Sequence, residues 1–172
     1  MDDHTHHEIK EVNDYPTFYN VYKTYTYPPY NEDWTDSEIE QEYQNINQRG
    51  FLYGYFIDGK CIGILALRIK DQPLEFDNNT KSIYLSDLTV VYKYNKSDTA
   101  LKLIEFAINY AKENEYSLIY LRTLKDNYSN EYKVFKKVGF TKMPDVIEVV
   151  KRKRTRLMKE EDCRFFWQLK LN

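Results

Sequence analysis

The sequence of 172 residues predicts a single α/β domain, and three patterns support this prediction. Residues 82–91 form an apolar, β-rich run, and after a short polar loop the apolar positions up to Asn114 follow helical spacing. Asp58-Gly59 joins two apolar runs, which is a strong signal for a tight hairpin. Residues 163–171 partly alternate between polar and apolar side chains, as in a half-buried strand. Together these patterns predict a mixed sheet flanked by helices.

The remaining elements are predicted from boundary signals and periodicity. Asp14 followed by Pro16 marks the start of a first helix, and Thr35 with Glu38 has the form of a capping box for a second. Strands are predicted at residues 9–12, 51–57, 60–70, 82–91, 118–124, 146–150 and 163–171. Further helices are predicted at residues 100–114 and 131–138. Residues 1–8 are expected to form a flexible tail.

The composition argues against several classes of protein. The formal net charge of −2 gives no excess of basic residues for binding nucleic acid. No segment approaches the roughly 20 apolar residues of a membrane-spanning helix, and the first residues contain no apolar signal core. Cys61 and Cys163 give no disulfide framework, so a cytoplasmic location is expected. His4, His6 and His7 fall in the expected tail, where nothing fixes a ligand geometry, so no metal site is predicted.

The polar loop between the apolar strand and the central helix is a candidate binding site. It has the sequence NKSDTA at residues 95–100. The first amides of a helix have no acceptor within the helix and point outward, where they attract anions. A strand that leads directly into such a helix start therefore predicts an anion-binding loop.

Two motifs in this region resemble those of the GNAT N-acetyltransferases. Residues 88–101, LTVVYKYNKSDTAL, match the acetyl-CoA-binding motif of that family without a gap, with Tyr94 at the family's tyrosine and Ala100 at its last small residue. Residues 135–140, FKKVGF, resemble the family's Tyr-x-x-x-Gly-Phe. The order and spacing of the two motifs make the resemblance fairly specific. It implies the GNAT fold, a mostly antiparallel mixed sheet of about six to seven strands with about four helices.

The resemblance implies that acetyl-CoA is the cosubstrate. In this family the pantetheine arm lies along the strand that precedes the phosphate loop and bonds to its main chain. Carried over to matching positions, the implied cofactor-binding residues are Leu88, Thr89, Val90, Asn95, Lys96, Ser97, Asp98, Thr99, Ala100, Asn127 and Phe135.

Asp98 departs from the family pattern, because it replaces the first glycine of the loop. A carboxylate there would repel phosphates and compete for the positive end of the helix. Acidic residues are also favoured as helix caps, and we take this structural role as the first interpretation of Asp98. Lys93, Lys96 and Lys102 are near enough in sequence to compensate in part.

Phe135 is a second departure from the family pattern. It replaces the tyrosine that in this family protonates the departing CoA thiolate, and phenylalanine has no proton to give. Tyr132 lies one helical turn earlier and is predicted to take over that role, although this chain contains 17 tyrosines.

Two segments are candidates for binding the acceptor. YLSDL at residues 84–88 resembles a stretch of the polyamine-type acetyltransferases in which an acidic pair lines the acceptor pocket. Asp87 is therefore predicted to orient the amine or accept its proton; a structural acid at a strand end is equally compatible. Strand alternation predicts that Ser86 and Asp87 lie on opposite faces. Tyr30 and Trp34 have carboxylates nearby, which suits a cationic amine, but packing on the sheet explains them equally well.

Three functions are compatible with these observations. The first is acetyl transfer from acetyl-CoA to a primary amine of a small molecule, for which a cationic, polyamine-like compound is one option, or of a protein. The second is a GNAT-fold binding or regulatory module without catalysis, which Asp98 and Phe135 together favour. The third is transfer from a different acyl donor. The family resemblance also suggests a homodimer, and neither nucleic acid nor a membrane is an expected partner.

Overall fold

The computed structural model describes residues 5–24, 35–124, 130–150 and 162–171 of the chain. In this part the elements follow the predicted order of strands and helices. Their bounds are β1 His7–Glu11, α1 Tyr15–Tyr22, α2 Asp36–Arg49, β2 Gly50–Ile57, β3 Lys60–Arg68, β4 Ser82–Val90, α3 Thr99–Glu113, β5 Leu118–Leu124, α4 Asn130–Lys137, β6 Thr141–Val150 and β7 Asp162–Lys170. A short 3₁₀ helix, η1, covers Tyr92–Tyr94 between β4 and α3.

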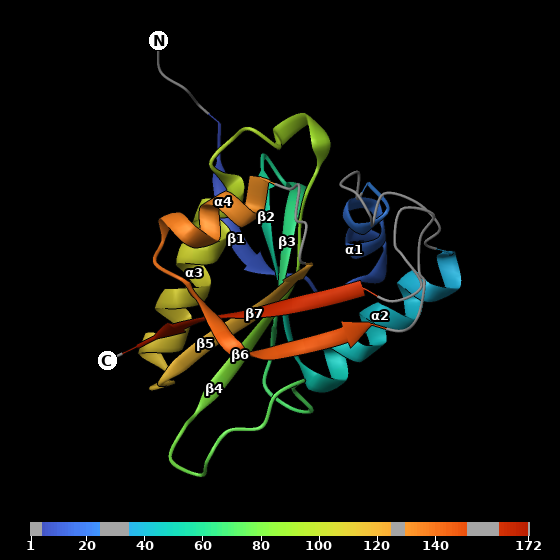
Figure 1. Ribbon diagram of the computed structural model, residues 1–172. Helices are drawn as coiled ribbons and strands as arrows, with labels where there is room; N and C mark the ends of the chain where they lie inside the picture. Colours follow the sequence, from blue (N-terminus) through green and yellow to red (C-terminus); the bar gives the residue numbers. More distant parts are fainter. Residues whose placement is uncertain (1–4, 25–34, 125–129, 151–161, 172) are drawn as a thin grey trace.

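The described strands form one sheet in the order β1-β2-β3-β4-β5-β7-β6 (Figure 1). Neighbouring strands are antiparallel, except for the parallel pair β4 and β5. The prediction of a mixed, mostly antiparallel sheet with helices is therefore confirmed. A parallel pair needs a crossover connection, and α3 supplies it.

The helices cover both faces of the sheet. In Figure 1, α3 and α4 lie on one side of the sheet and α1 and α2 on the other. The larger apolar core lies under α3 and α4 and includes Leu67, Leu85, Leu103 and Ile104. A second core joins α1 and α2 to β2 and β3. Within the described ranges, none of the helices combines the length and the apolar character needed to cross a bilayer.

Two local predictions are confirmed in detail. Asp58 and Gly59 have φ values of 48° and 81°, as a two-residue hairpin with the twist of the strands requires. At the start of α2, the Thr35 hydroxyl accepts from the Glu38 amide at 3.1 Å. The Glu38 carboxylate in turn accepts from the Thr35 amide at 3.3 Å, which completes the capping box.

Two boundaries differ from the prediction. His7 and Glu8, expected in the tail, pair with Ile57 and Phe56 in β1, so the edge strand starts earlier. β6 begins at Thr141 rather than at residue 146, and its pairing with β7 shifts between Lys142 and Ile147. That stretch contains a proline, which has no amide hydrogen for the ladder and so hides a strand from sequence patterns.

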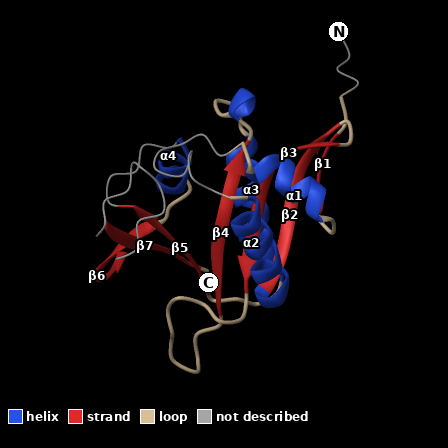
Figure 2. Ribbon diagram, turned by 90° about the vertical axis from the view of Figure 1, so that its right-hand side faces the viewer, coloured by secondary structure: helices blue, strands red, loops and turns tan. Residues whose placement is uncertain are grey.

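The pairing of β4 with β5 ends early and opens the sheet. The parallel register runs from Ser82 with Leu118 to Tyr84 with Tyr120, although both strands continue beyond it. In Figure 2, β4 runs upward while β5 and β7 turn away from it. The last part of β4 therefore keeps β3 as its strand partner on one edge, and among the described strands none pairs with its other edge.

Candidate functional site

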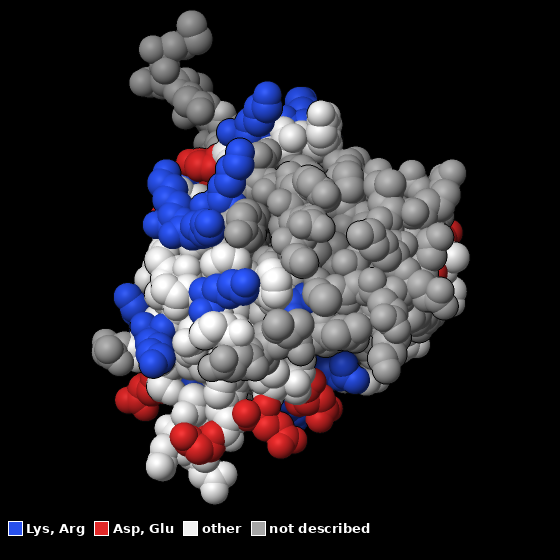
Figure 3. Space-filling model, in the orientation of Figure 1, with Lys and Arg blue, Asp and Glu red and all other residues white. Residues whose placement is uncertain are grey.

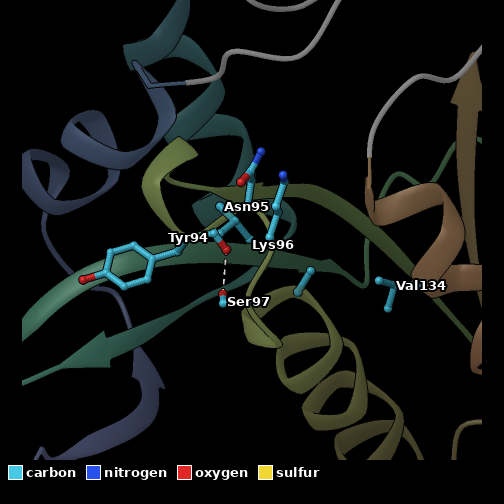
Figure 4. Close-up of a pocket in the computed structure, with 7 residues that line it drawn as sticks. Tyr94, Asn95, Lys96, Ser97 and Val134 are labelled. Carbon is cyan, nitrogen blue, oxygen red and sulfur yellow. Dashed lines mark hydrogen bonds between the residues drawn. The ribbon is translucent and has the colours of Figure 1, made fainter.

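A pocket of about 380 Å³ lies where β4 ends and α3 begins. It is lined by Val90, Tyr94, Asn95, Lys96, Ser97, Ala100 and Val134. Figure 4 shows the loop residues at the start of α3 and Val134 facing them from α4. Most of these lining residues belong to the segment that the sequence predicts to bind an anion.

The side chain of Ser97 stabilises the turn from β4 into α3 by hydrogen bonds to Tyr94 and Thr99. Its hydroxyl donates to the carbonyl oxygen of Tyr94 at 2.6 Å, the contact drawn in Figure 4. The same hydroxyl accepts from the amide of Thr99 at 3.3 Å. Ser97 thus partly caps α3, a role that the sequence interpretation gave to Asp98.

The first amides of α3 are available to a ligand. The backbone ladder of the helix starts with Lys102, whose amide donates to the carbonyl of Asp98 at 2.9 Å. Within the described residues, the amides of Ala100 and Leu101 make no hydrogen bond. Both lie in the first turn of a helix of 15 residues, whose dipole favours a negative charge at this end. The predicted anion-binding loop therefore has the donors that it needs.

Asp98 occupies the position before α3, but its side chain makes no capping hydrogen bond. The carboxylate lies 3.4 Å from the ammonium of Lys102 and is 60% exposed. It does not line the pocket, whereas Lys96 does. The pairing with Lys102 reduces the repulsion of phosphate by Asp98, and it also engages one of the lysines expected to compensate.

The free edge of β4 has the main-chain groups that the resemblance assigns to pantetheine. Leu88 and Thr89 are buried, with 7% and 1% exposure, so their side chains are held in the core. Their main chain follows a bulge in which β4 has one residue more than β3 between Ser86 and Thr89. An extended ligand can add to such an edge as an extra strand.

Asp87, predicted to be catalytic, lies in that bulge with a φ of 57°. Its Oδ2 accepts from Arg68 Nη2 at 3.1 Å and from the Ser86 hydroxyl at 2.7 Å. Its Oδ1 accepts from the Tyr22 hydroxyl at 3.2 Å. The structure thus gives Asp87 several polar partners, while Oδ1, with one long hydrogen bond, retains capacity for another donor.

Arg68 connects three elements of the fold. Beyond Asp87, its Nη2 donates to Glu42 of α2 at 2.5 Å and its Nε donates to the Ser86 hydroxyl at 2.9 Å. Burial opposes the charge, but the carboxylates of Asp87 and Glu42 outweigh it and raise the pKa of the Arg68 guanidinium. Arg68 therefore stays charged and joins α2 to the bulge of β4.

The predicted separation of Ser86 and Asp87 onto opposite faces is wrong. Both side chains bond to Arg68 and to each other. The extra residue of the bulge and the positive φ of Asp87 break the alternation on which that prediction rested.

Several predicted site residues lie outside what the structure describes. Tyr30, Trp34 and Asn127 are outside the described ranges. Tyr132 belongs to α4, but its side chain is likewise outside the description. Phe135 is 6% exposed and packs edge-on against Phe140 at a centroid distance of 5.9 Å.

The sequence interpretation missed Val134, which α4 contributes to the pocket. It also missed Arg68, Glu42 and Tyr22, which surround Asp87. The one available signal for Arg68 was a charged residue ending an apolar strand, and nothing in the sequence paired it with Glu42 or Asp87.

Lysines gather near the mouth of the pocket. In Figure 3, blue side chains cluster over α4 and the segment that follows β4. The exposed lysines in these segments are Lys93, Lys96, Lys133, Lys136 and Lys137. Although the chain is acidic overall, this part of the surface attracts anions.

Comparison with known proteins agrees with this fold. The sequence model of the acetyltransferase (GNAT) family matches residues 15–140, which is most of the chain. This protein therefore belongs to the GNAT acetyltransferase family.

Individual relatives are more distant. Streptothricin acetyltransferase A of Bacillus subtilis (strain 168) is 28% identical over 119 residues, or 66% of this chain. The chain spans 63% of the length of that curated relative. The solved ribosomal-protein-S18-alanine N-acetyltransferase of Escherichia coli has a TM-score of 0.72 at 14% identity, covering 97% of this chain and 95% of that one.

A structure from Bacillus anthracis with acetyl coenzyme A bound, named for streptothricin acetyltransferase, is also similar. It has a TM-score of 0.55 and 24% identity, and the match covers 72% of this chain and 64% of that one. These solved structures establish the fold of the chain.

The buried position of Arg68 leads to a prediction about stability. Arg68→Met should lower the free energy of unfolding by about 3–5 kcal/mol, because Asp87 and Glu42 would each lose a buried cationic partner. Urea denaturation would measure this loss. Arg49→Met is the matched control, since Arg49 contacts only the exposed Asp71, at 4.0 Å. This substitution should lower the free energy of unfolding by about 0.5 kcal/mol or less. Equal losses in the two variants would contradict the assignment.

Proposed function

We propose that this protein is an acetyl-CoA-dependent N-acetyltransferase that acts on a primary amine of a small molecule or a protein. The observation that carries the proposal is the gap between β4 and β5, which opens beside the pocket at the start of α3. Membership of the GNAT family agrees with it. A cytoplasmic location and a homodimeric state are kept as expectations from the sequence.

The pocket and the free edge of β4 fit the two halves of the cosubstrate. The amides of Ala100 and Leu101, with Lys96, would bind the pyrophosphate, while the main chain of residues 88–90 would bond to pantetheine. Acetyl-CoA would supply an activated acetyl thioester. Of the other residues implied by the resemblance, Asn95 and Ser97 line the pocket, Thr99 is buried beneath it, and Asn127 and Phe135 are retained as proposals.

The acceptor amine would approach Asp87 from the α1 and α2 face. Asp87 Oδ1 carries one long hydrogen bond from Tyr22 and can accept another from an ammonium group. Tyr30 and Trp34 remain proposed contacts of the acceptor. Similarity to proteins named for streptothricin acetylation supports a small-molecule amine over a protein amino group.

Acetyl transfer requires few side-chain groups. The amine must be neutral and close to the thioester, and its proton must leave to Asp87 or to water. Main-chain donors at the free edge of β4 would face the oxyanion as it develops. We assign Tyr132 as the donor of a proton to the CoA thiolate, because Phe135 has no hydroxyl and is buried. The lack of a hydroxyl at Phe135 also favours the second candidate, a binding module without catalysis.

The first experiment is calorimetric titration with acetyl-CoA at low salt, followed by detection of free thiol with a panel of primary amines. Micromolar binding and thiol release with at least one amine are expected. Binding without turnover would favour the non-catalytic module. An absence of binding at millimolar acetyl-CoA would reject the proposed cosubstrate, and longer acyl-CoA would be titrated next.

Removing the charge of Asp98 should improve cosubstrate binding. Asp98→Gly is expected to tighten acetyl-CoA affinity by about 1 kcal/mol, since a negative charge near the phosphates is lost and Lys102 is released from its ion pair. Calorimetry would measure the change. Glu105→Gln, farther along the same helix and exposed, is the control and should have a smaller effect. Unchanged or weaker binding by Asp98→Gly would refute the argument.

The proposed role of Tyr132 as proton donor can be tested by removing its hydroxyl. Tyr132→Phe should lower kcat by about 100-fold and leave acetyl-CoA affinity nearly unchanged, as expected for loss of a general acid. Steady-state kinetics and calorimetry would separate the two quantities. Tyr116→Phe, just beyond the C-terminal end of α3, is the control. A loss of less than threefold would show that water protonates the thiolate instead.

A further inference from the structure

The sheet ends in β1, and one edge of this strand is open. β1 lies at the end of the sheet away from β6, and among the described strands it pairs only with β2 (Figure 2). The Val12 amide, just beyond β1, donates to the Leu52 carbonyl at 2.8 Å, so the even-numbered residues of this segment bond toward β2. Because antiparallel pairing alternates, the amides and carbonyls of residues 7, 9 and 11 point outward. Such groups can pair with a further strand.

The side chains of β1 divide between the two faces of the sheet. Ile9 packs against the core under α3. Glu8 and Lys10 lie on the opposite face, where Lys10 Nζ is 4.5 Å from the centre of the Phe56 ring. The Glu8 carboxylate and the Lys10 ammonium are 3.3 Å apart, and their side chains are 38% and 51% exposed. Both charges are therefore within reach of a strand placed beside β1.

The charges of β1 are arranged symmetrically about Ile9. The strand reads HEIKE, so acid and base lie at equal distances on either side of one apolar residue. When such a strand is placed antiparallel to a copy of itself with Ile9 opposite Ile9, Glu8 lies opposite the partner's Lys10. His7 then lies opposite the partner's Glu11. Charged residues on an edge strand normally prevent pairing with other strands, but in this register they complement a second copy.

We propose that β1 pairs with β1 of a second copy of this chain, around a two-fold axis at Ile9, so that one sheet runs through a homodimer. A two-fold axis makes every contact twice, and the residues with outward amides face each other across it. The pairing supplies about six main-chain hydrogen bonds. The proposal concerns assembly of the chain and does not depend on acetyl transfer.

The alternative registers are excluded by hydrogen bonding or by charge. A slip of one residue turns the outward amides of one strand toward groups of the other that already bond to β2. A slip of two residues in one direction places Glu8 opposite the partner's Glu8, and in the other direction Lys10 opposite the partner's Lys10. Like charges directly opposite each other are destabilising. The register centred on Ile9 avoids both conflicts.

Tyr55 holds His7 in place for its contact with the partner. The distance between His7 Nδ1 and the Tyr55 hydroxyl is 2.7 Å, and the two rings meet edge-on at a centroid distance of 5.7 Å. Tyr55 is 3% exposed, so its ring is fixed by the core. The other ring nitrogen of His7 remains for the partner's Glu11.

The interface is small, because β1 has five residues in each copy. Stable interfaces usually bury at least about 1,200 Å², which a pair of such strands does not reach. We therefore expect a reversible dimer with a dissociation constant on the order of 10–100 μM.

Sedimentation velocity from about 1 to 500 μM protein, combined with hydrogen exchange, tests the proposal. The average mass should rise toward twice the monomer mass, and the Ile9 amide should become protected over the same concentrations. A mass that stays at the monomer value would overturn the proposal. A rise in mass without protection of the Ile9 amide would place the dimer contact elsewhere and also overturn it.

Charge reversal tests the register. Glu8→Lys and Lys10→Glu should each weaken self-association by about tenfold, because each creates two like-charged pairs across the axis. An equal mixture of the two single variants should associate as tightly as the parent protein, since every pair then has opposite charges. The double variant Glu8→Lys/Lys10→Glu should also associate like the parent.

Glu75→Lys and Lys112→Glu reverse exposed charges away from β1 and serve as controls, which should associate like the parent. Thermal melting would confirm that all variants are folded. Two folded single variants that dimerise like the parent, or a mixture that associates no better than its components, would reject the register.

Discussion

The early end of the hydrogen bonding between β4 and β5 is the constraint on which the site depends. Backbone amides and carbonyls that lose a strand partner must find water or a ligand instead. After Tyr84 the main chain of β4 is in that position on one edge, while β3 holds the other. The same divergence ends beside the start of α3, where helix amides also lack internal acceptors. An extended ligand with a phosphate end satisfies both sets of groups.

Arg68 shows how the fold keeps this opening in shape. A buried guanidinium is costly unless its hydrogen bonds are made, and here they are made to α2 and to the bulge of β4. The left-handed backbone of Asp87 is itself unfavourable for a residue with a side chain. The contacts to Arg68 and Tyr22 hold it in place. The contacts of the Asp87 carboxylate thus offset its backbone strain at the point where acceptor and thioester would meet.

Much of the fold could be predicted from the sequence, because it follows local signals. The capping box at Thr35, the Asp58-Gly59 turn and the change of period after β4 each depend on neighbouring residues. The anion-binding loop was found for the same reason. The bulge was missed because Asp87 lies inside an apolar strand without a neighbouring glycine or proline, although aspartate adopts a positive φ more readily than most residues. The partners of Arg68 were missed because Glu42 and Asp87 are 26 and 19 residues away in sequence.

The placement of the two proposed ligand sites on opposite sides of one sheet has a consequence for kinetics. The pocket lies between the start of α3 and α4, whereas Asp87 bonds to Tyr22 of α1 and to Arg68, which also bonds to Glu42 of α2. Donor and acceptor would therefore enter by separate routes and meet only in the gap between the strands. Neither would need to leave before the other arrives, so a ternary complex would form, and double-reciprocal rate plots for the two substrates should intersect rather than run parallel.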